Sequence, residues 1–75
     1  METAGQRIKK LRHAKGWNQT ELGQRIGVSK QQVMRYETKG IRTMRVHRLY
    51  DMAAALGCSV SDILEPETPI DSERR

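Results

Sequence analysis

The chain has 75 residues, of which 36% are hydrophobic, and its 14 lysines and arginines outnumber 9 acidic residues to give a net charge of +5. A chain this short forms one small domain, with room for a single core but not for a deep catalytic cleft. No apolar run approaches the roughly 20 residues that cross a bilayer, and the polar, basic start of the chain lacks the apolar stretch of a signal peptide. We therefore expect a cytoplasmic protein with no membrane partner.

Apolar residues recur at helical spacing and never alternate over the length of a strand, which predicts an all-α fold. Helix starts are indicated where Ser, Thr or Asn is followed three residues later by Gln, Glu or Asp, as in a capping box. Such pairs begin at Thr3, Asn18, Ser29 and Ser59, and Thr43 is a plainer cap. Helix ends are indicated by glycines at positions 16, 27, 40 and 57. In chain order, the predicted helices cover residues 4–15, 19–26, 30–38, 44–56 and 60–64.

The same periodicity predicts one core to which all five helices contribute. Its members are Ala4, Ile8, Leu11, Leu22, Ile26, Val33, Tyr36, Leu49, Met52, Ala53, Leu56, Ile63 and Leu64. Trp17 and Val28 are expected to cover the turns; for Trp17 the alternative is stacking on a ligand, but a lone Trp beside a helix end is more often part of a core. Residues 65–75 hold two prolines, mixed charges and a single isoleucine, so we expect a domain over residues 1–64 followed by a disordered tail.

Charge is distributed unevenly along the chain. Residues 5–48 carry 12 basic and 2 acidic side chains, a balance of +10, whereas residues 49–75 carry 2 basic and 6 acidic ones, a balance of −4. Glu2 supplies the remaining −1, which restores the total of +5. The natural partner of such a basic region is a polyanion, with an ordinary solvated basic helix as the alternative, and charge alone does not identify the polyanion.

The most informative stretch is residues 19–38, QTELGQRIGVSKQQVMRYET, where a glycine joins two short predicted helices. A tight helix-turn-helix requires a small residue where the helices cross and a turn residue that tolerates a left-handed backbone. Gly23 and Gly27 meet these two requirements. The apolar residues that flank them are Leu22, Ile26, Val28, Val33 and Tyr36. Together these seven positions predict a helix-turn-helix.

With these positions the chain resembles the lambda Cro and repressor-like helix-turn-helix proteins, also called the XRE family. The resemblance covers about residues 5–64 and includes IKKLRHAKGWNQTEL at 8–22 and LYDMAAALGCSVSDIL at 49–64. It implies a compact five-helix domain that binds specific sequences of double-stranded DNA, with the third helix in the major groove. Because one such helix reads only a few base pairs, we expect a transcriptional regulator that binds a pseudo-palindromic operator as a homodimer through its C-terminal helices. With no second domain to hold one, a small-molecule effector is not expected.

The exposed face of the third predicted helix is the candidate base-reading surface. Helical geometry places Val33 and Tyr36 on the side of the core. The opposite side carries Gln31, Met34, Arg35 and Thr38. A glutamine amide pairs with adenine, an arginine pairs with guanine, and a methionine contacts the methyl group of thymine. The predicted base contacts are Lys30 in the first turn, Gln31, Met34 and Arg35.

An alternative interpretation of this face, and of Gln32 beside it, stays open. A polar helix face is more often simply solvated, and only the helix-turn-helix context together with the absence of acidic residues from 30 to 34 favours base reading. Gln32 is ambiguous, because the capping box of Ser29 would engage it with the backbone.

Phosphate contacts position a protein on DNA without reading its sequence. By the resemblance, Asn18 and Gln19 meet the backbone at the start of the second helix, aided by the partial positive charge of a helix N-terminus. Four further phosphate contacts are expected in the loop after the third helix, with a flexible basic loop as the alternative: Lys39, Gly40, Arg42 and Arg45. The resemblance also implies that Arg12 pairs with Glu37 in a structural role.

An enzyme is not expected. Cys58, His13 and His47 have neither the partners of a catalytic site nor the spacing of a zinc site, so we predict no catalytic residue, metal or cofactor. Cys58 stands where the family usually has a valine, which favours a small buried side chain over a redox sensor. The alternative is a protein-interaction adaptor or antitoxin-type module on the same fold. The adaptor would lack sequence preference on DNA.

Overall fold

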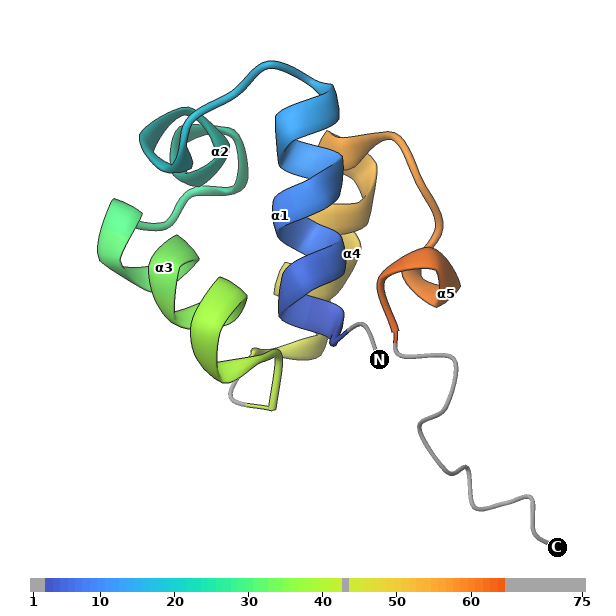
Figure 1. Cartoon of the computed structure of the whole chain (residues 1–75). Helices are drawn as coiled ribbons and strands as arrows, with labels where there is room; N and C mark the ends of the chain where they lie inside the picture. The colour runs from blue at the N-terminus through green and yellow to red at the C-terminus, as the bar shows by residue number, and fades with distance from the viewer. Residues whose placement is uncertain (1–2, 43, 65–75) are drawn as a thin grey trace, which may run out of the picture.

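The computed structural model describes residues 3–42 and 44–64 of the chain. Within these residues the chain forms five α-helices and no strand, which confirms the predicted all-α architecture (Figure 1). The helices are α1 (Ala4–Ala14), α2 (Gln19–Ile26), α3 (Lys30–Lys39), α4 (Val46–Leu56) and α5 (Val60–Ile63). The predicted cap at Thr43 and the predicted disordered tail at 65–75 lie outside the described residues.

The first helix, α1, occupies a central place among the others. It packs against α3 on one side and against α5 on the other, while α2 contacts both α3 and α4 (Figure 1). The fourth helix, α4, also packs against α5. This arrangement leaves α3 at the edge of the domain, with one face directed away from the other helices.

Capping boxes begin the first two helices, as the sequence predicts. In α1 the backbone N–H of Gln6 donates to Thr3 Oγ1 at 3.1 Å, and the backbone N–H of Thr3 donates to Gln6 Oε1 at 2.8 Å. In α2 the corresponding pair is Asn18 and Glu21, with both bonds at 2.8 Å. These bonds satisfy amides that a helix start leaves without a partner in the helix.

The box predicted at the start of α3 is only half formed. The backbone N–H of Gln32 donates to Ser29 Oγ at 3.1 Å, but the Gln32 side chain donates to the hydroxyl of Tyr36 at 3.2 Å instead of returning to the backbone.

At the start of α5 the backbone N–H of Ser59 donates to Asp62 Oδ2 at 3.1 Å. This bond to the charged form lowers the pKa of Asp62 below its ordinary value.

The helix boundaries differ most from the predicted ones at the start of α4, which begins at Val46 rather than at residue 44. Arg45 precedes the helix with an extended backbone and makes no capping bond with its side chain. The backbone N–H of Met44 is instead used in a turn, where it donates to the carbonyl of Ile41 at 3.0 Å. Three helix ends differ by one residue, since α1 ends at 14, α5 ends at 63 and α3 continues to 39, and the predicted ends of α2 and α4 are confirmed.

A single hydrophobic cluster lies between the five helices. Its buried members are Ala4, Ile8, Leu22, Ile26, Val33, Tyr36, Met52, Ala53, Leu56 and Ile63. Leu11, Leu49, Trp17 and Val28 are half-buried and pack at its edge, so the first two are less central than predicted. The prediction for Leu64 is wrong: its side chain is 39% exposed, because α5 ends at Ile63 and the backbone of Leu64 is extended.

The helix-turn-helix is formed by α2 and α3 as predicted, and its two glycines explain why the turn is tight. A Cβ at Gly23 would lie 2.5 Å from the carbonyl oxygen of Val28, so the turn can approach α2 this closely only at a glycine. Gly27 ends α2 with a left-handed backbone, at φ +78° and ψ +31°. Both glycines therefore have the roles that the sequence assigns to them.

Gly5 has a comparable role that no local pattern in the sequence predicts. A Cβ there would overlap the carbonyl oxygen of Glu37 and lie 2.7 Å from that of Tyr36. The first turn of α1 consequently rests directly on the backbone of the last turns of α3.

Gly5→Ala is expected to destabilise the domain by about 1 to 3 kcal/mol, because α1 must move away from α3 to accommodate the methyl group. In a free helix the same change is favourable by roughly 0.5 to 1 kcal/mol. Urea unfolding followed by circular dichroism measures the difference, with Lys9→Ala on the exposed face of α1 as a control that changes stability by less than about 0.5 kcal/mol. A more stable Gly5→Ala protein would contradict the close approach of the two helices.

Candidate nucleic-acid interface

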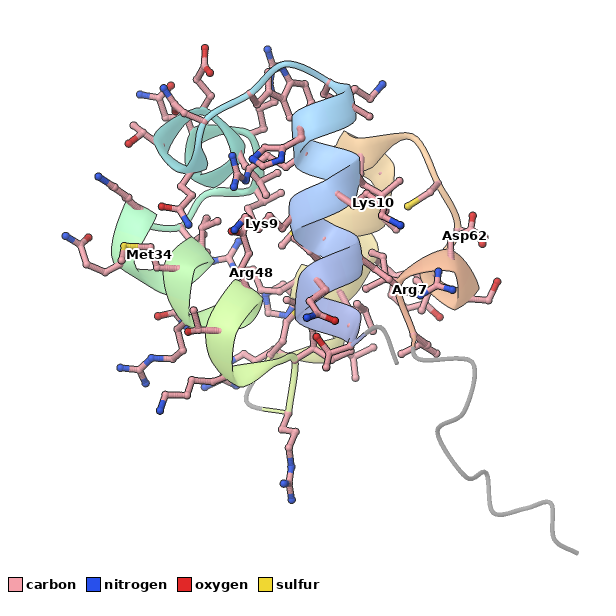
Figure 2. The ribbon with its side chains drawn as sticks, viewed as in Figure 1. Arg7, Lys9, Lys10, Met34, Arg48 and Asp62 are labelled. Carbon is pink, nitrogen blue, oxygen red and sulfur yellow. The ribbon has the colours of Figure 1, made fainter. Side chains whose placement is uncertain are left out.

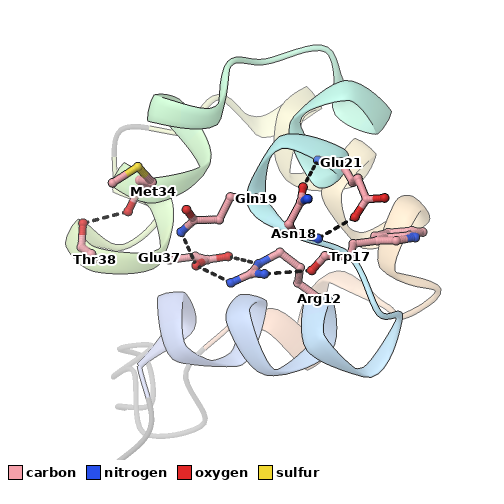
Figure 3. A network of polar contacts seen from close by, with 8 residues as sticks. All are labelled: Arg12, Trp17, Asn18, Gln19, Glu21, Met34, Glu37 and Thr38. Atoms are coloured by element: carbon pink, nitrogen blue, oxygen red, sulfur yellow. Dashed lines mark hydrogen bonds and ion pairs between the residues drawn. The ribbon is translucent and has the colours of Figure 1, made fainter.

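A buried ion pair joins α1 to α3 (Figure 3). Arg12 Nε donates to Glu37 Oε2 at 2.7 Å, and Arg12 Nη2 donates to Glu37 Oε1 at 3.2 Å. The two side chains are only 7% and 3% exposed. The pairing implied by the family resemblance is therefore confirmed.

Two neighbours complete the hydrogen bonding of this pair. Arg12 Nη1 donates to the carbonyl oxygen of Trp17 at 2.9 Å, and Gln19 Nε2 donates to Glu37 Oε1 at 3.0 Å (Figure 3). The network links α1, the turn after it, the start of α2 and the C-terminal half of α3. Because a buried carboxylate is costly without its partners, these bonds hold α3 in one rotation about its own axis.

The rotation of α3 presents the predicted base-reading face to solvent. All four predicted base contacts are exposed: Lys30, Gln31, Met34 and Arg35. On the opposite side, Val33 and Tyr36 are 0% and 2% exposed. Figure 2 shows Met34 on the side of α3 turned away from α1. No acidic residue occurs between positions 30 and 36, and the acidic residue that follows, Glu37, is buried.

Three of these side chains share one depression in the surface of α3. It is lined by Gln31, Met34, Arg35, Thr38 and Lys39, and Lys30 is not part of it. Thr38 falls on the exposed side in the helical projection but is absent from the predicted site. The signal that could have placed it there is its spacing of four residues from Met34, which puts both side chains on one face.

The first group of predicted phosphate contacts lies at the start of α2. Asn18 is exposed, and its Oδ1 accepts the capping bond from Glu21. Gln19 is half-buried, and one of its two amide hydrogens is donated to Glu37. This bond spans 18 positions, and no local pattern in the sequence predicts it.

The second group lies in the loop that leaves α3. Lys39, Arg42 and Arg45 are exposed, so three cations follow the candidate base-reading face in quick succession. Gly40 is half-buried, with φ +89° and ψ −170°, a conformation that is essentially restricted to glycine. It ends α3 and turns the chain into the basic loop.

Arg48 also supports the helix-turn-helix, a role that no local pattern in the sequence predicts. Its Nη1 donates to the carbonyl oxygen of Ile26 at 2.6 Å, at the last residue of α2. A cation at this position interacts favourably with the partial negative charge of a helix C-terminus. Arg48 thereby ties α4 to the turn that precedes α3.

The remaining residues with chemical potential have structural surroundings. Trp17 packs against the core, and the guanidinium carbon of Arg25 lies 4.2 Å from its ring centroid. Cys58 is half-buried, and burial raises the pKa of its thiol, an effect that the charge of Asp62 reinforces. The reactive thiolate is thus disfavoured, which fits the expected small apolar role.

Two kinds of site are absent from the part of the chain that the structure describes. No three His, Cys, Asp or Glu side chains come together there as ligands for a metal ion. None of the described helices has the length and apolar character that crossing a bilayer demands.

Comparisons with known proteins identify the same region of the chain. Residues 7–69 match the family model of the Cro/C1-type HTH DNA-binding domain. An uncharacterized transcriptional regulator in the ATPase CF(0) region of Rhodospirillum rubrum is 43% identical over 56 residues, which are 75% of this chain and 51% of that protein. An uncharacterized HTH-type transcriptional regulator of Sinorhizobium fredii is 40% identical over 72 residues, 95% of this chain and 50% of that protein. The chain therefore spans about half the length of these curated relatives.

A solved structure has the same architecture. The crystal structure of a hypothetical transcription factor from Neisseria superimposes with a TM-score of 0.75 at 30% sequence identity, covering 85% of this chain and 72% of that one.

Arg12→Met is expected to destabilise the domain by about 3 to 5 kcal/mol, because it leaves the Glu37 carboxylate buried without its cation. The double variant Arg12→Met/Glu37→Met should recover much of this loss, since no unpaired charge remains. Chemical denaturation measures the free energy of unfolding of the wild type, the single variant and the double variant. Arg35→Met, an exposed arginine of α3, is the matched control and should change stability by less than about 0.5 kcal/mol. Equal losses for Arg12→Met and Arg35→Met would show that the buried pair does not hold α3.

Proposed function

The chain belongs to the Cro/C1-type helix-turn-helix family of DNA-binding domains, a class of transcriptional regulators and not of enzymes, and from this membership we propose that it binds specific sequences of double-stranded DNA as a homodimer. The observation that carries the proposal is the outer face of α3. It is exposed, free of acidic side chains from 30 to 36, and backed by the buried Arg12–Glu37 pair. Such a face suits the major groove, where a rigid helix presents polar side chains to base edges.

Four side chains of α3 are proposed to contact bases: Lys30, Gln31, Met34 and Arg35. The amide of Gln31 matches the N6 and N7 atoms of adenine, and the fork of Arg35 matches O6 and N7 of guanine. Lys30 stands in the first turn of α3, where recognition helices in this type of motif reach the bases. Met34 supplies apolar contact.

The proposed phosphate contacts flank this face along the chain: Asn18 and Gln19 before α3, and Lys39, Gly40, Arg42 and Arg45 after it. Gln19 keeps one amide hydrogen for a phosphate oxygen while the other is bonded to Glu37. The backbone contact would then be connected directly to the network that holds α3, which makes Gln19 the best supported member of this group.

Dimerisation is proposed to occur through the C-terminal helices. Val46 and Tyr50, one turn apart on α4, are 70% and 62% exposed, and Leu64 after α5 is 39% exposed. Large apolar side chains in such positions favour association, and two copies would read two half-sites about one helical turn of DNA apart. Regulation would then follow protein concentration in the cytoplasm, without a small-molecule effector.

The base and phosphate assignments predict different behaviour for two arginines. Arg35→Ala should cost about 1 to 3 kcal/mol on a preferred duplex selected from a random pool and little on a scrambled one. Arg42→Ala should weaken binding to both duplexes and reduce the slope of log affinity against log salt by about one. Fluorescence anisotropy at several salt concentrations measures both effects.

Each outcome of this experiment is informative. Equal losses for Arg35→Ala on the two duplexes would exclude base reading by Arg35, and an unchanged salt slope would exclude Arg42 as a phosphate contact. A wild-type protein with no preferred duplex at all would contradict the proposed function and favour a protein-interaction module.

Light scattering tests the dimer at micromolar concentrations, alone and with the preferred duplex. We expect a dimer for the wild type and a shift to monomer for Tyr50→Glu, because the charge disrupts an apolar contact. His13→Glu, which adds a charge at an exposed site on α1, is the control and should remain dimeric. A strict monomer, both alone and on DNA, would rule out the homodimer.

A further inference from the structure

The depression on α3 is lined by apolar as well as cationic side chains. Met34 is its large apolar member and is 43% exposed, whereas Val33 and Tyr36 of the same helix are buried. This Met lies in the middle of the candidate recognition helix, between side chains that can pair with bases. Its exposed surface is therefore available to an apolar group of a ligand.

Thr38 also lines the depression, and its side chain carries a methyl group. Its hydroxyl donates to the backbone carbonyl of Met34 at 2.8 Å (Figure 3). With the hydroxyl engaged by its own helix, the methyl is the part of the side chain that remains for a ligand. Met34 and Thr38 are four residues apart and lie one turn from each other on the same face of α3. We refer to this pair, with Gln31 and Arg35 beside it, as the α3 notch.

The surroundings of the α3 notch are polar and cationic. Gln31, Arg35 and Lys39 line the same depression. The partner that complements these charges is a polyanion, so the apolar group must project from a polyanion. In the major groove of DNA the group of this kind is the C5-methyl of a pyrimidine, which thymine carries and cytosine gains on methylation.

We propose that the α3 notch recognises the C5-methyl group of a pyrimidine, thymine or 5-methylcytosine, next to a guanine read by Arg35. The inference rests on the proposed function, and it assigns to Thr38 a role in specificity. Met34 and Thr38 contact the methyl group, while the adjacent guanidinium of Arg35 pairs with the neighbouring guanine. The protein would then distinguish a methylated from an unmethylated pyrimidine at one position of its site.

The test starts from duplexes selected from two random pools, one unmethylated and one with methylated CpG cytosines. In the selected duplex each thymine is replaced in turn by deoxyuridine, and each 5-methylcytosine by cytosine. At one pyrimidine next to a guanine, removal of the methyl group should lower the affinity about fourfold, the factor that corresponds to one buried methylene. A thymine at the sensitive position identifies thymine as the ligand, and a sensitive position found only in the methylated pool identifies 5-methylcytosine.

Variants show whether the α3 notch is responsible. In Met34→Ala the ratio of the affinities for the methylated and the unmethylated duplex should fall below about twofold. Thr38→Ser keeps the hydroxyl bond and loses the methyl group, so it should reduce this affinity ratio in part. Thr20→Ser makes the same chemical change at an exposed site on α2 and should keep the full ratio. Circular dichroism should match the wild type in all three variants, since none of these side chains is buried. Thr20→Ser, which lies outside the α3 notch, should also keep the wild-type affinity for scrambled DNA.

The opposite results are equally clear. A preferred duplex that is indifferent to every methyl group, or a ratio that survives in Met34→Ala, would overturn the α3 notch while leaving sequence-specific binding intact. The absence of any preferred duplex would contradict the proposed function and the α3 notch together.

Discussion

The orientation of α3 depends on the buried pair between Arg12 and Glu37. Each oxygen of the carboxylate accepts from the guanidinium, and Gln19 adds a further bond, so any rotation of α3 would leave charge buried without a partner. A hydrophobic contact alone tolerates small rotations because dispersion has no preferred direction. The ion pair does not tolerate such rotations, and it thereby decides which side chains of α3 face solvent.

The same pair also shapes the electrostatics of the outer face. Glu37 is the one acidic residue in the α3 sequence KQQVMRYETK, and it is held inside against a cation from α1. The outer face is left with amide, cationic and apolar groups. A polyanion approaching α3 therefore meets no negative charge from this helix, and the positive end of α2 and the basic loop after α3 extend the attractive surface.

Three further residues determine how closely the helices meet around α2 and α3. Gly5 lets the start of α1 touch the backbone at the end of α3, and Gly23 lets the turn after α2 cross that helix closely. Arg48 joins α4 to the end of α2. The helix-turn-helix is consequently supported from both α1 and α4, which suits a surface that must match DNA without rearranging on contact.

The sequence by itself determined the five helices, the helix-turn-helix and the exposed side of α3, because capping boxes, left-handed glycines and helical periodicity act within about four residues. It failed at the start of α4, where Arg45 offers no capping bond, and at Leu64, which lies past the last helical turn. Only the tertiary structure decided that Gly5 lies against the backbone carbonyl of Glu37 and that Gln19 donates to its carboxylate. These contacts join residues far apart in the chain and depend on how the helices pack.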